Sequence, residues 1–181
     1  MRRRTFDALL SAVGVVLTLT LIVAGALLMW GAVFTNSEVQ SQLAAQKIVF
    51  PAKSALEGSA YALARPYAGE QLLTGAQAEA YANGKILPDL NEIAGGKTYS
   101  QLSAESLAQP KNTTLSGLVA TVFKGTTLRS ELLEAYGFSV FGQIALISSI
   151  VAFVLAGVML VLSLLGLAHF RRTPPTVEIQ M

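Results

Sequence analysis

The chain has 181 residues, of which 52% are hydrophobic and 13% are charged, and its formal net charge is +2. Soluble domains carry about 25% charged residues, so this composition indicates a membrane protein. The small net charge, without a basic patch interleaved with aromatic residues, argues against a nucleic-acid-binding protein. The sequence contains no cysteine, which excludes disulfide bonds and thiol chemistry.

Two long segments without any ionisable residue lie near the two ends of the chain, at residues 8–34 and 138–167. The hydrocarbon core of a bilayer requires about 20 helical residues, and both segments exceed this length. We therefore predict transmembrane helices over residues 8–34 and 138–167. Residues 35–137 would then form a separate domain between the two spans.

Arginines flank both predicted spans on the side of the chain termini: Arg2, Arg3, Arg4, Arg171 and Arg172. Basic residues next to a span are retained in the cytoplasm. The tails at residues 1–7 and 168–181 are therefore predicted to be cytoplasmic, and residues 35–137 extracytoplasmic. An exported domain without disulfides fits the inner (cytoplasmic) membrane of a bacterium.

A cleaved signal peptide is the alternative for the first span, with Ala24-Gly25-Ala26 as the cleavage site. However, the apolar run continues through Trp30 to Phe34, whereas the apolar region of a signal peptide has about 7–15 residues. We expect an uncleaved anchor, with Trp30 in the aromatic belt at the outer interface.

Asn36 and Ser37 could end the first helix or cap a second one. Residues 38–49 are predicted to form a short amphipathic continuation that closes at Pro51. Residues 52–64 are rich in alanine and are predicted to be helical up to Arg65-Pro66. Residues 67–70 have the composition of a turn.

The next helix is predicted to begin at Thr74, because Thr74 and Gln77 have the spacing of a capping box. Gly84 and Pro88 predict a break or kink near Leu87. Gly95-Gly96 then ends the helix. Thr98 and Gln101 repeat the capping-box spacing, which predicts a short helix through Ala108.

A further helix is predicted from Thr113 or Thr114 through Phe123, with Gly125 as its C-terminal stop. Thr127 is predicted to open a last helix that continues into the second span. The predicted fold class is therefore an all-α membrane protein, in which two transmembrane helices flank an extracytoplasmic helical domain of about 100 residues, enough for a modest core. The expected core residues are Phe50, Tyr61, Tyr67, Tyr81, Leu118 and Phe123.

An ordered series of short motifs spans the middle of the chain: QKIVFP from Gln46, PYAGEQ from Pro66, QAEAYA from Gln77, GGKTY from Gly95, FKGTTLR from Phe123, and Ala135-Tyr136. This series resembles a group of small two-span envelope membrane proteins of actinobacteria. Such proteins often carry the label of an aromatic-ring-opening dioxygenase, so the resemblance raises the question of iron chemistry.

A non-haem iron dioxygenase needs two histidines and a carboxylate. This chain has one histidine, His169, at the cytoplasmic end of the second predicted span. We therefore expect no enzyme activity, no cofactor and no metal site, and interpret His169 as an interfacial residue. The sequence has no second histidine, so we expect no Ser-His-Asp triad either.

Two local patterns could also indicate chemistry. Glu131 and Glu134 lie three residues apart and could bind a cation or act as acid and base. We favour a solvated helix face with Arg129 and Lys124 nearby. The Gly-Lys-Thr at residues 96–98 lacks the upstream glycine and the strand of a phosphate-binding loop, so it is interpreted as a helix stop and cap.

The second predicted span contains a stripe of small residues at helical spacing: Ala145, Ser148, Ser149, Ala152 and Ala156. Small residues let helix backbones approach closely in lipid. The first span adds the pairs Ala8/Ala12 and Thr20/Ala24. The stripe is predicted either to pack the two spans on each other or to dock on another protein.

The leading functional hypothesis is a non-enzymatic accessory or scaffolding subunit of a larger inner-membrane complex. Its partners would be the membrane and other integral membrane proteins, with possible lipid contact. The resemblance implies lipid-import or respiratory machinery as hosts. The alternative is an extracytoplasmic ligand-binding, lipid-binding or sensory module. Transport is disfavoured, because neither span contains the ionisable groups that transport pathways usually need.

Overall fold

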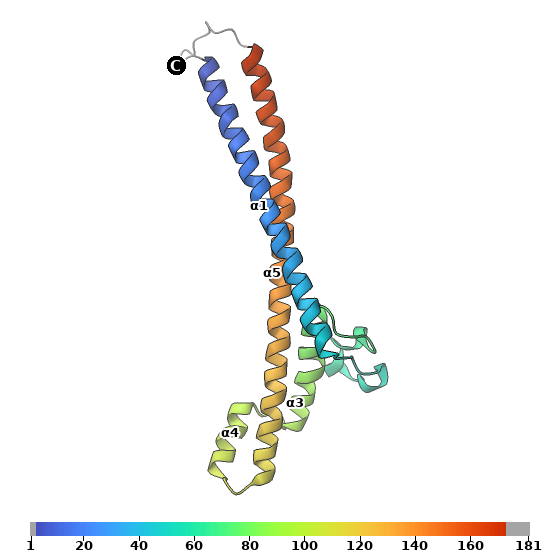
Figure 1. The fold of residues 1–181 in the computed structure, drawn as a ribbon. Helices are drawn as coiled ribbons and strands as arrows, with labels where there is room; N and C mark the ends of the chain where they lie inside the picture. Colours follow the sequence, from blue (N-terminus) through green and yellow to red (C-terminus); the bar gives the residue numbers. More distant parts are fainter. Residues whose placement is uncertain (1–2, 173–181) are drawn as a thin grey trace. The chain divides into compact units, whose positions relative to one another are not determined.

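The computed structural model describes residues 3–172, and every named element within them is helical. The α-helices are α1 (Arg3–Gln46), α2 (Gly75–Tyr81), α3 (Leu87–Ile93), α4 (Tyr99–Ala108) and α5 (Thr113–Arg172) (Figure 1). An isolated antiparallel bridge joins Val49 and Gln71. The prediction of a helical chain is confirmed for these residues. The predictions for Arg2 and for residues 173–181 lie outside them.

The chain divides into two compact units. One, here called the paired-helix unit, contains residues up to Val33 and from Gly142 onward. It includes the N-terminal part of α1 and the C-terminal part of α5. The other, here called the central unit, is Phe34–Phe141.

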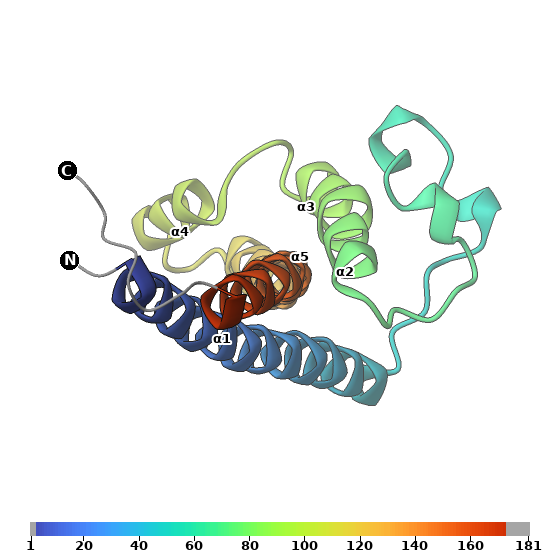
Figure 2. The same ribbon diagram turned by 90° about the horizontal axis from the view of Figure 1, so that it is seen from above.

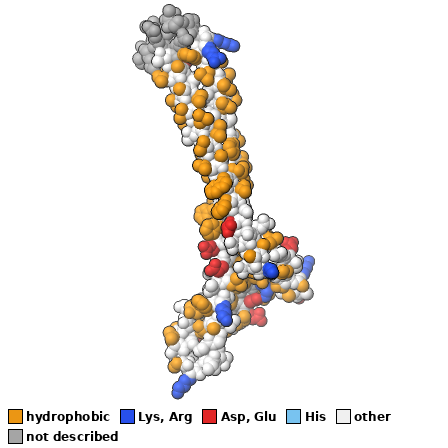
Figure 3. Space-filling model, viewed as in Figure 1, with side chains coloured by type: hydrophobic (Ala, Val, Ile, Leu, Met, Phe, Trp, Pro, Cys, Tyr) orange, Lys and Arg blue, Asp and Glu red, His pale blue; other side chains and the backbone are white. Residues whose placement is uncertain are grey.

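The paired-helix unit consists of two segments that are long and apolar enough to cross a membrane, one in α1 and one in α5. Only 17% of the most apolar 18-residue stretch of each helix is buried. Figure 3 shows hydrophobic side chains over the visible surface of these segments. A core helix of a soluble protein would instead bury its apolar side chains. The exposed surface is therefore what a lipid-facing helix pair requires.

The core of the central unit is built around Phe50, which is 2% exposed. Its ring lies 5.4 Å from that of Tyr67 and 5.0 Å from that of Tyr81, measured between centroids. Tyr61 also packs against this cluster, as predicted. Leu118 packs in a second, smaller cluster around Leu102.

Phe123 was predicted to be a core residue, and this prediction is wrong. Its side chain is 53% exposed, while the neighbouring Val122 is buried in the smaller cluster. On a helix, adjacent residues point about 100° apart, so only one of the two can face the core.

Both predicted capping boxes are present. The backbone N–H of Gln77 donates to Thr74 Oγ1 at 3.2 Å, and the backbone N–H of Thr74 donates to Gln77 Oε1 at 3.1 Å. Thr98 and Gln101 repeat this arrangement at the start of α4. The predicted break near Leu87 is a π-helical turn, η4 (Ala82–Ile86), between α2 and α3.

Residues 52–64 do not form the predicted helix. They contain the short 3₁₀ turns η1 (Lys53–Ala55) and η2 (Ser59–Tyr61), and η3 (Arg65–Tyr67) follows. Gly58, at φ +89°, separates the first two turns. The Arg65 side chain donates from Nε to the Leu56 carbonyl at 3.0 Å and from Nη2 to the Gly58 carbonyl, so it satisfies acceptors that a helix would have used.

The separate helix predicted from Thr113 to Phe123 is also wrong, because α5 runs through Gly125 and Thr127 without a break. A Cβ on Gly125 would lie 2.5 Å from Leu90 Cδ2, so this glycine permits close approach to α3 instead of ending a helix. The Thr127 hydroxyl donates to the Phe123 carbonyl at 3.0 Å within the helix instead of capping a new one. The N-terminal part of α5 thereby lies beside α3 and α4 (Figure 2).

The amphipathic continuation predicted at residues 38–49 is confirmed as far as Gln46, because α1 runs unbroken to that residue. It ends at Lys47, whose φ of +53° is left-handed. Such a residue terminates a helix by turning the backbone away from its axis. Asn36 and Ser37 are therefore interior, exposed residues of α1 and not caps.

The π-helical turn depends on Gly84. A Cβ there would lie 2.6 Å from the Ala64 backbone nitrogen and 2.8 Å from Leu63 Cβ. We expect Gly84→Ala to lower the free energy of unfolding of the central unit by about 1–3 kcal/mol, because backbone must shift to admit the methyl group. The measurement is the thermal midpoint of the near-ultraviolet circular dichroism of tyrosine, with the full chain in mild detergent.

Gly117→Ala is the matched control, since a Cβ at this helical glycine would meet nothing within 4 Å. This variant should unfold at or above the wild-type midpoint, because alanine is the better helix former by roughly 0.5–1 kcal/mol. A Gly84→Ala midpoint equal to that of the control would contradict the close contact.

Candidate functional site

Small residues line the contact between α1 and α5 in the paired-helix unit, and we call this contact the seam. Its members recur at intervals of seven residues: Ser11, Thr18, Gly25 and Ala32 on α1, and Gly142, Ser149, Ala156 and Ser163 on α5. All eight are buried. A strict seven-residue repeat is typical of helices that wind around each other with a left-handed twist.

The seam is held by close backbone approach and by an interhelical hydrogen bond from Ser149. The Ser149 hydroxyl donates to the Gly25 carbonyl at 3.0 Å, in a fully buried position. Gly14 faces Ser163, because a Cβ on this glycine would lie 2.3 Å from the serine Oγ. Glycine and serine thus let the two backbones approach where larger side chains would separate them.

The predicted small-residue stripe on α5 lies partly in this seam. Ser149, Ala152 and Ala156 are buried, whereas Ala145 and Ser148 are half-buried. The buried members therefore pack α5 on α1.

The pairs predicted on the first span lie off the seam. Ala12 and Thr20 are exposed, and Ala8 and Ala24 are only half-buried. The hydroxyl of Thr20 donates to the Val16 carbonyl of its own helix at 3.0 Å. The signal that locates the seam is the seven-residue interval at which small residues (glycine, alanine, serine or threonine) recur on both helices.

Within the central unit, an apolar groove with an acidic rim lies between the C-terminal part of α1 and a middle part of α5. We call it the acidic groove, and its volume is about 330 Å³. It is lined by Phe34, Thr35, Glu38, Val39, Gln42, Glu131, Glu134, Ala135 and Phe138. None of these residues is a lysine or an arginine.

The three glutamates of the acidic groove are exposed side chains. Glu38 Oε1 accepts a hydrogen bond from Gln42 Nε2 at 2.7 Å, which leaves its negative charge uncompensated. Arg129, expected near Glu131 and Glu134, instead donates from Nη2 to Asn83 Oδ1 at 2.8 Å. The solvated helix face predicted for Glu131 and Glu134 is thus the rim of a groove to which α1 adds a third carboxylate.

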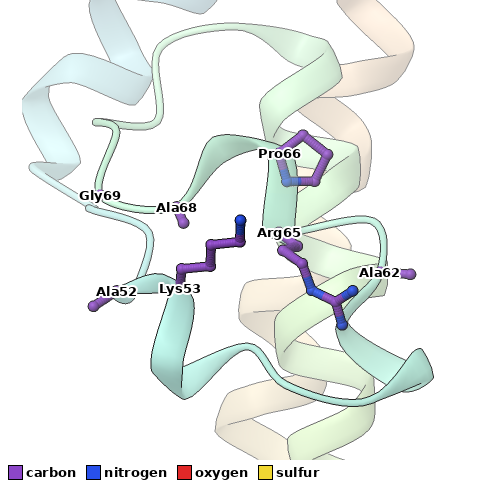
Figure 4. A pocket seen from close by; sticks show the side chains of 7 residues that line it. All are labelled: Ala52, Lys53, Ala62, Arg65, Pro66, Ala68 and Gly69. Carbon is purple, nitrogen blue, oxygen red and sulfur yellow. The ribbon is translucent and has the colours of Figure 1, made fainter.

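A second hollow in the central unit has basic residues at its edge (Figure 4). It is wide and shallow, and its lining includes Lys53, Arg65, Pro66 and Gly69. The Arg65 guanidinium is occupied by backbone carbonyls, as described above. The polar chemistry of this hollow therefore depends on the single exposed amine of Lys53, and we interpret the hollow as a product of the loop fold.

Tyr61, Lys85 and Asp89 form a polar cluster on the central unit. The Tyr61 hydroxyl donates to Asp89 Oδ1 at 3.1 Å, and Lys85 forms an ion pair with Asp89 Oδ2. The hydrogen bond to Asp89, with smaller effects of partial burial and of the carboxylate charge, raises the pKa of Tyr61 above 10.0. The cluster joins the irregular loop before α2 to α3, so its role is structural.

At one end of the paired-helix unit, His169 Nε2 lies 3.9 Å from Asp7 Oδ2. A protonated histidine would make this contact an ion pair between the ends of α1 and α5. Over residues 3–172 the structure places no three His, Cys, Asp or Glu side chains where they could hold a metal ion.

Comparison with protein-family models, with curated proteins and with solved structures finds no match. The seam, the acidic groove and the exposed apolar surface are the features of the molecule that bear on its function.

Larger side chains at the glycines of the contact between α1 and α5 should change the distance between the two helices. A Cβ on Gly166 would lie 2.6 Å from Ser11 Oγ, and one on Gly14 would lie 2.3 Å from Ser163 Oγ. We expect Gly14→Val and Gly166→Val to push the two helices apart, because a valine side chain at either position would overlap the facing serine, which must shift to admit it. Spin labels on cysteines introduced at the exposed Val13 and Leu165 would then report a longer mean distance in pulsed electron resonance.

Gly157→Val is the matched control on α5, since a Cβ at Gly157 would meet nothing within 4 Å. The chain has no native cysteine, so the two labels are unique. If all three variants gave the wild-type distance distribution, the seam would not determine how the helices pack.

Proposed function

We propose that this protein is a non-enzymatic accessory subunit of a larger complex in the inner membrane of a bacterium. Its two apolar helices would anchor it, and its central unit would bind the complex on the extracytoplasmic side. Exposed apolar surface of the central unit, outside the candidate spans, is the observation that supports binding to a protein partner.

This surface includes part of α4 and the facing part of α5. Leu107 is 80% exposed, and the exposed rings of Tyr99 and Phe123 pack together with their centroids 5.4 Å apart. Figure 3 shows hydrophobic side chains on the surface in the region of α4. Contiguous exposed apolar side chains in a water-facing domain mark interaction sites. A partner that covers them would remove this surface from water.

The proposed topology rests on the arginines at the chain ends. Arg171 and Arg172 follow the apolar part of α5, and Arg2 to Arg4 precede that of α1. Retention of these residues in the cytoplasm would place both termini there and the central unit outside. The motif series beginning at Gln46 supports an envelope protein of the actinobacterial kind, with lipid-import or respiratory machinery as the host.

A ligand-binding or lipid-binding module is the second candidate, and the acidic groove is the observation that favours it. An apolar cleft with a few polar groups is the usual form of a small-molecule site. Native mass spectrometry of the purified chain separates the two proposals. A retained small ligand supports the binding module, and a stoichiometric protein supports the subunit.

The topology predicts which introduced cysteines a membrane-impermeant maleimide can reach. With the reagent outside intact spheroplasts, we expect Leu63→Cys, which lies outside the proposed partner surface, to be labelled and Ala168→Cys to be labelled only after permeabilisation. Both positions are exposed, so local burial does not explain a difference. The opposite labelling pattern would place the central unit in the cytoplasm and refute the proposed topology.

The exposed apolar surface predicts the effect of polar substitutions on complex formation. We expect the tagged wild-type chain to co-purify in mild detergent with a stoichiometric membrane protein. The double variant Leu107→Ser/Phe123→Ser should retain about a tenth of it or less, because truncating two buried interface anchors costs 1 kcal/mol or more each.

Leu63→Ser is the control for this experiment. Leu63 is 58% exposed, close to the 53% of Phe123, but it lies in the loop before α2. Its variant should co-purify the partner at the wild-type level. A wild-type chain that purifies alone, as a monomer, would argue against an accessory subunit.

A further inference from the structure

We propose that the acidic groove binds a helical segment of the partner membrane protein that carries lysine or arginine next to apolar residues. This inference rests on the proposed subunit function and names the chemistry of one contact. It concerns a different surface from the apolar residues of α4 and α5.

The shape of the acidic groove fits a short stretch of helix. Its lining residues span 34–42 on α1 and 131–138 on α5. Each stretch is about two helical turns, or about 12 Å long. Phe34 and Phe138 are 56% and 54% exposed, and Val39 is buried at 9%. Apolar side chains of a docked helix would thus contact the rings of Phe34 and Phe138 and the apolar surface of the groove.

The charge of the groove selects a basic occupant. Glu38, Glu131 and Glu134 contribute three carboxylates, and none of them forms one of the ion pairs of the described residues. Carboxylates gathered without a cation repel one another, and a basic segment would relieve this repulsion while burying the apolar walls. The acidic rim disfavours an anionic lipid headgroup for the same reason.

The position of the groove along the chain favours a membrane partner. Phe34 is the last residue of the first predicted span, residues 8–34, and Phe138 is the first residue of the second, residues 138–167. α1 and α5 each continue unbroken from the groove residues into the apolar segments. A partner segment next to one of the partner's own transmembrane helices would therefore contact groove residues that lie next to the predicted spans of this chain.

The test uses the full chain in cells, with a photoreactive amino acid in place of Gln42, which lines the groove. We expect a crosslink to an integral membrane protein, with the attached peptide containing lysine or arginine and adjoining a span. The same photoreactive residue at the exposed Gln40, which does not line the groove, is the matched control and should give little of this product.

Neutralisation of the carboxylates gives the second measurement. The triple variant Glu38→Gln/Glu131→Gln/Glu134→Gln should reduce the Gln42 crosslink and the co-purified partner about tenfold, because three exposed charge contacts are lost. The control triple variant Glu57→Gln/Glu79→Gln/Glu92→Gln removes the same charge from the central unit outside the groove. It should leave both signals at the wild-type level.

Three outcomes would overturn the inference. These are a Gln42 crosslink to lipid or to a second copy of this chain, a crosslinked peptide without basic residues, and equal losses in the two triple variants. If the wild-type chain still co-purifies a stoichiometric partner, only the groove assignment fails. If the wild-type chain has no partner at all, the proposed function fails with it.

Discussion

Close packing of small residues along the seam is the constraint on which the paired-helix unit depends. Lipid is as apolar as a leucine side chain, so burial of apolar surface does not drive two helices together inside a membrane. Backbone proximity at Gly14 and Gly25 and the hydrogen bond from Ser149 replace that driving force. Serine is tolerated at Ser163 because it is small and because its hydroxyl donates to the Met159 carbonyl at 2.7 Å.

The same two helices change their packing chemistry within the central unit. The seven-residue interval continues from Ala32 to Val39 on α1, and Leu132 and Ser139 lie seven residues apart on α5. Val39 and Leu132 are buried in the larger hydrophobic core of the central unit. Large apolar residues there gain free energy from leaving water, whereas small residues in the seam gain it from contact. This change within single helices is what a boundary between lipid and water would select.

The sequence predicted the elements whose causes are local. The capping boxes at Thr74 and Thr98 need only residues three apart, and the apolar segments need only length and composition. Prediction failed where a distant residue decides the structure. Gly125 has the composition of a helix stop, but its contact with Leu90 explains it. The alanine-rich stretch at residues 52–64 favours a helix by propensity, but the side chain of Arg65 holds it in turns.

The candidate sites show the same division between local and distant causes. Counting small residues at helical spacing found Ser149 and Ala156, but it also included Ala145 and Ser148, which lie at the edge of the contact. Glu131 and Glu134 were visible as a pair on one helix. Glu38 could not be added to them from the sequence, because only the antiparallel course of α1 and α5 within the central unit brings it to the same groove.

The arrangement of the groove carboxylates suits the proposed binding of a basic segment. Glu38, Glu131 and Glu134 are all exposed and all lie on the rim of one groove. In the proposed contact, three charges on one rim would attract a multiply charged basic partner from a distance and orient it. Because exposed charges are screened by salt, the attraction sets the choice of partner, and the apolar walls of the groove supply the contact that holds it.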